Sequence, residues 1–104
     1  MDFSQIISKS KFLFDWGNQN PPQDFKVTEV GPDFINFNRP LSDRGEAPPG
    51  LTISIKVRHR WHEHEFTEIC WKKDETGQVI GLELSGDEGK MLEWRKSLEL
   101  GLCV

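Results

Sequence analysis

The last third of the chain holds three consecutive patterns that constrain the fold more than any other part of the sequence. An apolar triplet at 69–71 precedes a polar turn at Asp74–Gly77, and a second apolar stretch follows at 79–84. An amphipathic segment then runs from Asp87 to Leu100. Alternation with a period of two predicts strands, and apolar residues three or four positions apart predict a helix. Two strands that lead into a C-terminal helix are therefore expected here.

Residues around the predicted helix indicate where it begins, ends and packs. Ser85 or Asp87 can cap its first turn, because a short polar side chain at that place accepts hydrogen bonds from free N–H groups. Gly101 is well placed to end the helix. The apolar stripe that would pack on the sheet consists of Met91, Leu92, Trp94 and Leu98.

The segment Leu51–Arg58 is the clearest strand in the sequence, because apolar and polar residues alternate throughout it. The segment 59–66 is expected to contain the reversal into the next strand. The predicted core-facing rows are Leu51, Ile53, Ile55 and Val57 in the first strand, Ile69 and Trp71 in the second, and Ile80, Leu82 and Leu84 in the third. Cys70 would lie on the opposite face of its strand and pack as a small hydrophobe.

The N-terminal part of the chain predicts a short helix. Its apolar residues recur near helical spacing, and Asp2 or Ser4 could cap the start. A stretch at 16–22 that contains Gly and Pro cannot continue a helix. We therefore expect a helical extension over residues 1–16 and one domain over residues 17–104. The apolar residues of the extension are Phe3, Ile6, Ile7, Leu13 and Phe14.

Two short strand patterns, 25–27 and 34–37, flank the turn-forming sequence Val30–Asp33 and predict a hairpin. The polar, Pro-rich segment 39–50 is expected to be a long loop, and loops of this length often carry function. All patterns together predict a mainly β fold. It would be a small antiparallel β-barrel of five to six strands, or a strongly bent sheet, with a short N-terminal helix and a C-terminal helix.

Composition excludes several classes of function. The 104 residues are enough for one domain, and the net charge of -4 argues against a nucleic-acid-binding module, which needs a basic excess. Two cysteines do not make the disulfide framework of a small secreted protein, so we expect a cytoplasmic location. No apolar run approaches the roughly 18 to 20 residues of a membrane span, and no basic leader is evident. Neither export nor membrane insertion is expected.

The segment Phe25–Leu100 resembles the PilZ domain, a small β-barrel module of bacteria. The resemblance lies in the order of a hairpin, a Pro-rich loop and the stretches GLTISIKV, EICW, GQVIGLEL and MLEWRKSL. PilZ barrels commonly end in a strand with an apolar-x-Trp element, a turn, a strand with an Ile-Gly-apolar step and a helix. The same succession in this chain implies a PilZ-like β-barrel with a C-terminal helix.

PilZ domains bind the second messenger cyclic di-GMP through an RxxxR motif and a D/N-x-S-x-x-G motif. Paired arginines clamp the phosphates, and small residues let the backbone approach the ligand. This chain departs from both motifs. Lys9 and Lys11 occupy the place of the arginine pair, and Glu29, Gly31 and Phe34 stand where the family has Asp or Asn, Ser and Gly. Cyclic di-GMP binding of the usual kind is therefore not expected.

Members of the PilZ family without these motifs resemble protein-interaction modules, some of which act in type IV pilus assembly or surface motility. The resemblance thus implies a non-enzymatic module, without a cofactor, that binds another protein in a bacterial signalling or surface-motility system. An atypical cyclic di-GMP receptor is the alternative function. Its contacts would be Arg39, Arg44, Gly31 and Glu29.

A second alternative is a metal site, because His59, His62 and His64 are close in sequence and imidazoles are ligands of zinc, nickel and copper. On a strand His62 and His64 would share a face while His59 points away, so a three-histidine site requires a turn between them. The other interpretation is a charged hairpin tip that happens to be rich in histidine.

The chain contains four tryptophans, and aromatic side chains of this size dominate both cores and interfaces. Trp71 and Trp94 belong to core-facing patterns. Trp16 and Trp61 lie among polar neighbours, so they would either anchor a protein partner or cap the ends of the barrel. The apolar C-terminus would pack back on the domain or contact a second subunit, which leaves a homodimer open.

Overall fold

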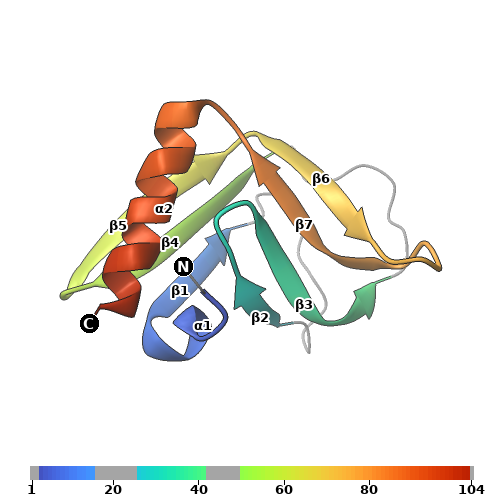
Figure 1. Cartoon of the computed structure of the whole chain (residues 1–104), viewed down its shortest axis with the longest axis horizontal. Coiled ribbons are helices and arrows are strands. Elements are labelled where there is room, and N and C mark those ends of the chain that lie inside the picture. The colour runs from blue at the N-terminus through green and yellow to red at the C-terminus, as the bar shows by residue number, and fades with distance from the viewer. Residues whose placement is uncertain (1–2, 16–25, 42–49, 104) are drawn as a thin grey trace.

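The protein is described from a computed structural model, which describes residues 3–15, 26–41 and 50–103. It is mainly β, with a short helix near the N-terminus and a longer helix at the C-terminus (Figure 1). The elements are α1 (Ile6–Lys9), β1 (Lys11–Asp15), β2 (Val27–Val30), β3 (Phe34–Leu41), β4 (Leu51–Val57), β5 (Arg60–Phe66), β6 (Glu68–Lys73), β7 (Val79–Ser85) and α2 (Glu88–Leu102).

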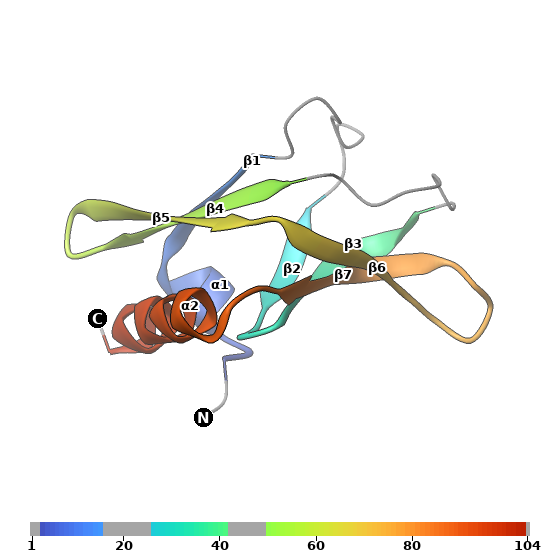
Figure 2. The same ribbon diagram turned by 90° about the horizontal axis from the view of Figure 1, so that it is seen from above.

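The seven strands in the described part of the chain form two antiparallel sheets. One sheet has the order β1-β4-β5 and the other the order β2-β3-β7-β6. The chain passes from the first to the second sheet at Thr67, where β5 runs into β6 along one bent path, and the tips of the β4–β5 and β6–β7 hairpins lie at opposite ends of the molecule (Figure 2). Within residues 3–15, 26–41 and 50–103 no strand pairing joins the two sheets. The mainly β class with a helix near each end is confirmed, whereas the closed barrel is not. The predicted number of five to six strands is wrong, since the described residues form seven.

The core fills the space between the two sheets and α2. The alternation predicted for β4 is confirmed, since its four apolar residues are all buried and Ile53 and Ile55 have no exposed surface. The largest buried side chain is that of Trp94 on α2, whose Nε1–H donates a hydrogen bond of 3.2 Å to the carbonyl oxygen of Gly31. The indole therefore holds α2 against the turn between β2 and β3.

The start of α2 is as predicted, but its end is not. The Asp87 side chain accepts a hydrogen bond of 2.8 Å from the backbone N–H of Lys90, which confirms Asp87 as the N-cap. The prediction that Gly101 ends the helix is wrong, because α2 continues to Leu102. Leu92, predicted to pack inward, is 53% exposed.

Gly101 lies where α2 crosses α1 and β4. A Cβ at this position would come within 3.0 Å of side-chain atoms of Ile6, Ser10 and Ile55. Ser10 also donates a hydrogen bond through its Oγ to the Gly101 carbonyl oxygen, at 3.3 Å. Gly101 is therefore a site of close helix packing and not a helix terminator.

The helical extension predicted for residues 1–16 is confirmed only for its middle. α1 covers four residues, and the chain is already extended at Ser10. Phe12, Leu13 and Phe14 are in β1, which pairs with β4, so the helical prediction for Leu13 and Phe14 is wrong. Phe12 and Phe14 pack against the core and Leu13 points away from it, as a strand requires. The predicted boundary at residue 16 lies outside the described residues.

Two predicted connections are also shifted. β3 continues to Leu41, so the first residues assigned to the long loop belong to a strand, and residues 42–49 lie outside the described part. The reversal assigned to 59–66 is a two-residue turn at Arg58 and His59, and Arg60–Phe66 is strand. In β7 the pairing shifts beside Lys73, which buries Val79 in place of Ile80. The predicted turn at Asp74–Gly77 is confirmed.

No helix among the described residues has the length and apolar character needed to cross a membrane.

The β4–β5 turn generates a stability prediction. Arg58 and His59 have φ values of 52° and 70°, a left-handed conformation that costs about 1–2 kcal/mol for a residue with a Cβ. Two-residue hairpin turns favour Asn-Gly at these positions. The double variant Arg58→Asn/His59→Gly should therefore raise the free energy of unfolding by about 1 kcal/mol, measured by urea denaturation.

The matched contrast is Gly77→Ala. Gly77 also has a positive φ, of 86°, and its Cβ would meet nothing within 4 Å, so backbone strain alone should lower the free energy of unfolding by about 1 kcal/mol. A double variant at 58 and 59 that is no more stable than the parent would contradict the left-handed turn.

Candidate functional site

The three-stranded sheet has one face against the core and one face that points away from α2. His64 and Phe66 of β5 contact the indole of Trp94 on the inner side, so alternation places their neighbours in β5 on the other side. The cross-strand register gives the rows of this outer face as Lys11, Lys56 and Trp61, then Leu13, Ser54 and Glu63, then Asp15, Thr52 and Glu65.

Two large apolar side chains are exposed on this outer face. Leu13 is 59% exposed and Trp61 is 44% exposed. The Lys56 Nζ lies 5.8 Å from the centroid of the Trp61 ring, a cation–π contact that favours one placement of both side chains. An exposed tryptophan among charged neighbours has the chemistry of an interface anchor, because its ring is apolar and its N–H can find a polar partner.

A hollow of about 420 Å³ adjoins the outer face at the end near the β4–β5 turn. Five of its six lining residues are basic, and none of the described residues that line it carries a carboxylate. The chain as a whole has a net charge of -4, so the charge of this group is opposite in sign to the net charge of the chain. We call this site the basic hollow; it is lined by Lys9, Ser10, Lys11, Lys56, Arg58 and His59.

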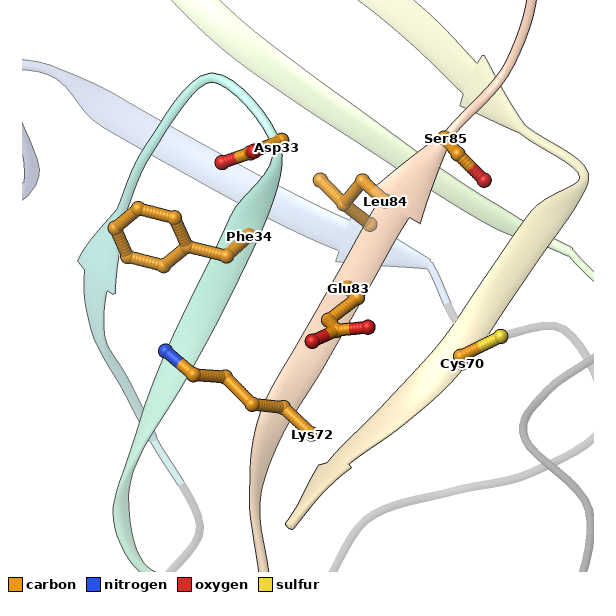
Figure 3. A pocket seen from close by; sticks show the side chains of 7 residues that line it. All are labelled: Asp33, Phe34, Cys70, Lys72, Glu83, Leu84 and Ser85. Carbon is orange, nitrogen blue, oxygen red and sulfur yellow. The ribbon is translucent and has the colours of Figure 1, made fainter. Parts of the chain in front are cut away.

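A larger hollow, of about 470 Å³, lies on the outer face of the four-stranded sheet (Figure 3). The Lys72 side chain reaches toward the Phe34 ring, with Nζ 4.8 Å from the ring centroid. The same Nζ donates a hydrogen bond of 3.1 Å to Asn36 Oδ1, and Asn36 Nδ2 donates one of 2.7 Å to Glu29 Oε1. The lining residues are Asp33, Phe34, Cys70, Lys72, Glu83, Leu84 and Ser85.

This second hollow is better explained as a structural network than as a ligand site. The cation of Lys72 is already engaged by an aromatic ring and by an amide that is itself bonded to a carboxylate. Gly81 makes the arrangement possible, since a Cβ there would collide with the carbonyl oxygen of Ile35 and lie 3.0 Å from Asn36 Oδ1. Cys70, predicted to pack as a small hydrophobe, is instead exposed here, and this prediction is wrong.

The residues named for cyclic di-GMP do not gather around a basic pocket in the described part of the chain. Glu29 bonds Asn36, and Gly31 lies so close to Phe34 that a Cβ on Gly31 would overlap its ring. Arg39 lies in β3, with a side chain outside what is described, and Arg44 is not among the described residues. A hollow of about 200 Å³ beside Gly31 is lined by Phe3, Ser4, Glu29, Val30, Gly31, Pro32 and Phe34.

The three histidines have different surroundings. His59 is in the turn, His62 is exposed, and His64 is half-buried beneath α2. His64 Nε2 and Ser97 Oγ share a hydrogen bond of 2.8 Å, and the imidazole lies edge-on to the Trp94 ring at 5.1 Å. Among the described residues no three His, Cys, Asp or Glu side chains are arranged to hold a metal ion. His62 and His64 share a face of β5, as their spacing predicts.

The packing role of His64 was not foreseen from the sequence. Burial is the main cause that lowers the pKa of His64 below its ordinary value of 6.5, and the nearby charge of His62 lowers it further, while Glu93 on α2 raises it. The native state therefore favours the neutral imidazole. No local pattern could have indicated this, because Ser97 and Trp94 meet His64 only through tertiary structure.

The lowered pKa predicts the pH dependence of stability. The unfolded chain, with His64 near 6.5, binds this proton more readily than the native chain, so stability falls as the pH drops through 6.5 toward the lower native pKa. Urea denaturation between pH 7.5 and 5.5 should show this loss. The loss should be smaller in His64→Gln than in His59→Gln, a matched change of an exposed histidine in the turn. Equal pH slopes for both variants would contradict the burial of a neutral His64.

Trp16, the other predicted anchor, lies outside the described residues. The basic hollow was missed at the level of sequence, although the basic run Lys56, Arg58, His59 and Arg60 across a turn was a usable signal. Lys9 and Lys11 come from a distant part of the chain and reach the hollow only because β1 pairs with β4.

The chain matches no protein-family model, no curated protein and no solved structure. The PilZ resemblance therefore rests on the sequence elements alone.

Proposed function

We propose that this chain is a regulatory protein-interaction module that binds another protein through the outer face of the three-stranded sheet. The observation that carries the proposal is the exposed Trp61, which lies against Lys56 on the face opposite to α2. Leu13 extends the apolar surface on the same face. The surrounding Lys and Glu side chains supply the polar rim that protein interfaces have around an apolar centre.

The energetics support Trp61 as an anchor. Tryptophan is enriched among the few residues that carry most of the binding energy of an interface. Covering the exposed 44% of this side chain removes on the order of 100 Å² of largely apolar surface from water. At about 25 cal/mol per Å² this contributes about 2–3 kcal/mol to binding.

The proposed module is PilZ-like and non-enzymatic, and it acts in a bacterial signalling or surface-motility system in the cytoplasm. What supports the PilZ relation is the order of the hairpin, the strand pairs and the C-terminal helix along the sequence. Free thiols at Cys70 and Cys103 suit a reducing compartment. The acidic net charge favours a protein over a nucleic acid as partner.

The competing functions gain no support from the described residues. The hollow beside Gly31 is lined by the Glu29 carboxylate and by no basic side chain among the described residues, which is unfavourable for a cyclic dinucleotide. The His64 imidazole is engaged by Ser97, and among the described residues no three His, Cys, Asp or Glu side chains are arranged to hold a metal ion. We therefore argue for protein binding alone.

The proposal is tested with Trp61→Ala and Leu13→Ser variants. Each should reduce capture of the native partner from an extract of the source organism by at least about tenfold, because the loss of a central anchor costs more than about 1.4 kcal/mol. Quantitative mass spectrometry of the captured proteins is the measurement. Both residues are exposed, so circular dichroism should show an unchanged fold.

Leu92→Ala is the matched control, because Leu92 is 53% exposed but lies on α2. It should capture the partner as the parent does. If the protein lost with Trp61→Ala is lost equally with Leu92→Ala, or is retained by all three variants, the outer face is not the binding surface.

A further inference from the structure

We infer that the basic hollow receives an acidic segment of the protein partner while Trp61 and Leu13 hold the apolar part of the same partner. This inference rests on the proposed function and adds the chemistry of the partner. It also fixes the orientation of the partner, because the hollow lies at one end of the outer face and the acidic segment would bind at that end.

Basic residues from separate segments of the chain converge on the basic hollow. Lys9 ends α1, Lys11 begins β1, Lys56 belongs to β4, and Arg58 and His59 form the β4–β5 turn. These residues line one hollow in a chain that is acidic overall. Positive charge concentrated at a concave surface attracts anions and raises their association rate.

Without an anion, the arrangement of the lysines at the hollow is unfavourable. Lys11 and Lys56 are directly opposite each other in the β1–β4 register, and like charges at opposed positions destabilise a strand pair. Lys56 also contacts the Trp61 ring, so the hollow and the apolar anchor are adjacent on the outer face. Carboxylates in the hollow would relieve the repulsion between the two lysines.

The backbone of the β4–β5 turn also indicates a functional role for its two basic residues. Arg58 and His59 adopt left-handed backbone conformations that other residues accept at lower cost. The chain thus places two basic side chains at the rim of the hollow where Asn and Gly would give a more stable hairpin. Departures from local preference without a structural gain occur at functional sites.

The kind of anion follows from the geometry. The cations are mostly lysines, which act as separate point charges on flexible stems, and only one guanidinium is present to grip a phosphate in a bidentate manner. Several carboxylates spaced along a peptide suit such a rim better than one compact phosphate. The same face carries Glu63 and Glu65 away from the hollow, which would repel an acidic segment placed in the wrong direction.

The test is an NMR titration of the whole chain with hexaglutamate, and with hexaglutamine as the uncharged control. Hexaglutamate should give saturable amide shifts confined to residues 9–11 and 56–61, and hexaglutamine should give none. The double variant Lys11→Gln/Lys56→Gln should weaken the binding of hexaglutamate about tenfold. The control variant Lys96→Gln, which changes an exposed lysine of α2, should bind hexaglutamate as the parent does. Higher salt should weaken the binding.

A second readout separates a binding role from a structural one. Arg58→Asn should weaken the binding of hexaglutamate and at the same time raise the urea midpoint of the free protein. Replacement of an arginine with a purely structural role would lower the midpoint instead. Shifts that are absent, or that spread over the lysines of α2, would overturn the inference. Tighter binding of inorganic pyrophosphate than of hexaglutamate at the hollow would also overturn it and indicate a phosphate ligand.

The two proposals can fail separately. Hexaglutamate binding at the hollow with partner capture insensitive to Trp61→Ala would refute the proposed function alone. Partner capture that requires Trp61 but is unchanged by Lys11→Gln/Lys56→Gln would refute the acidic segment alone.

Discussion

The fully buried indole of Trp94 is the contact on which the arrangement of the two sheets depends. Its ring lies edge-on to Phe66, at 5.6 Å, and to His64 in the three-stranded sheet. Its N–H donates to the Gly31 carbonyl oxygen at the β2–β3 turn of the four-stranded sheet. One side chain thus connects α2 with both sheets, and truncation of such a buried tryptophan typically costs about 3–5 kcal/mol.

The position of α2 decides which face of the three-stranded sheet is available for binding. The helix covers the side of β5 that carries His64 and Phe66, so the alternate residues of β5 remain on the other side. Close approach of α2 to α1 and β4 requires the missing Cβ of Gly101. The exposed Trp61 is therefore a consequence of how the helix packs, since a one-residue shift of β5 would exchange its two faces.

Features that depend on near neighbours in the sequence could be predicted, and features that depend on distant pairing could not. The buried row of β4, the turn at Asp74–Gly77 and the Asp87 cap follow from alternation and local hydrogen bonding. The helical prediction for Leu13 and Phe14 is wrong because β1 becomes a strand only through its pairing with β4. The prediction that Gly101 ends the helix is wrong because the need for a glycine comes from contacts with distant residues of α1 and β4, which no local pattern indicates.

The same distinction applies to the candidate site. The exposed tryptophan at 61 could be foreseen from its polar neighbours, and the structure places it on an uncovered face. The basic run at 56–60 could indicate only one side of the basic hollow, because Lys9 and Lys11 are about 45 residues away from it in sequence. The three histidines are close in sequence but have different surroundings in the structure. His59 lies in the turn, and α2 partly buries His64.

The most direct test of this account is hydrogen exchange of the tryptophan indole N–H groups, resolved by NMR and assigned with Trp→Phe variants. The account predicts that the Trp94 indole proton exchanges only when the whole domain unfolds, while the Trp61 indole proton exchanges at the rate of an unprotected group. Rapid exchange at Trp94, or strong protection at Trp61 in the free protein, would contradict it.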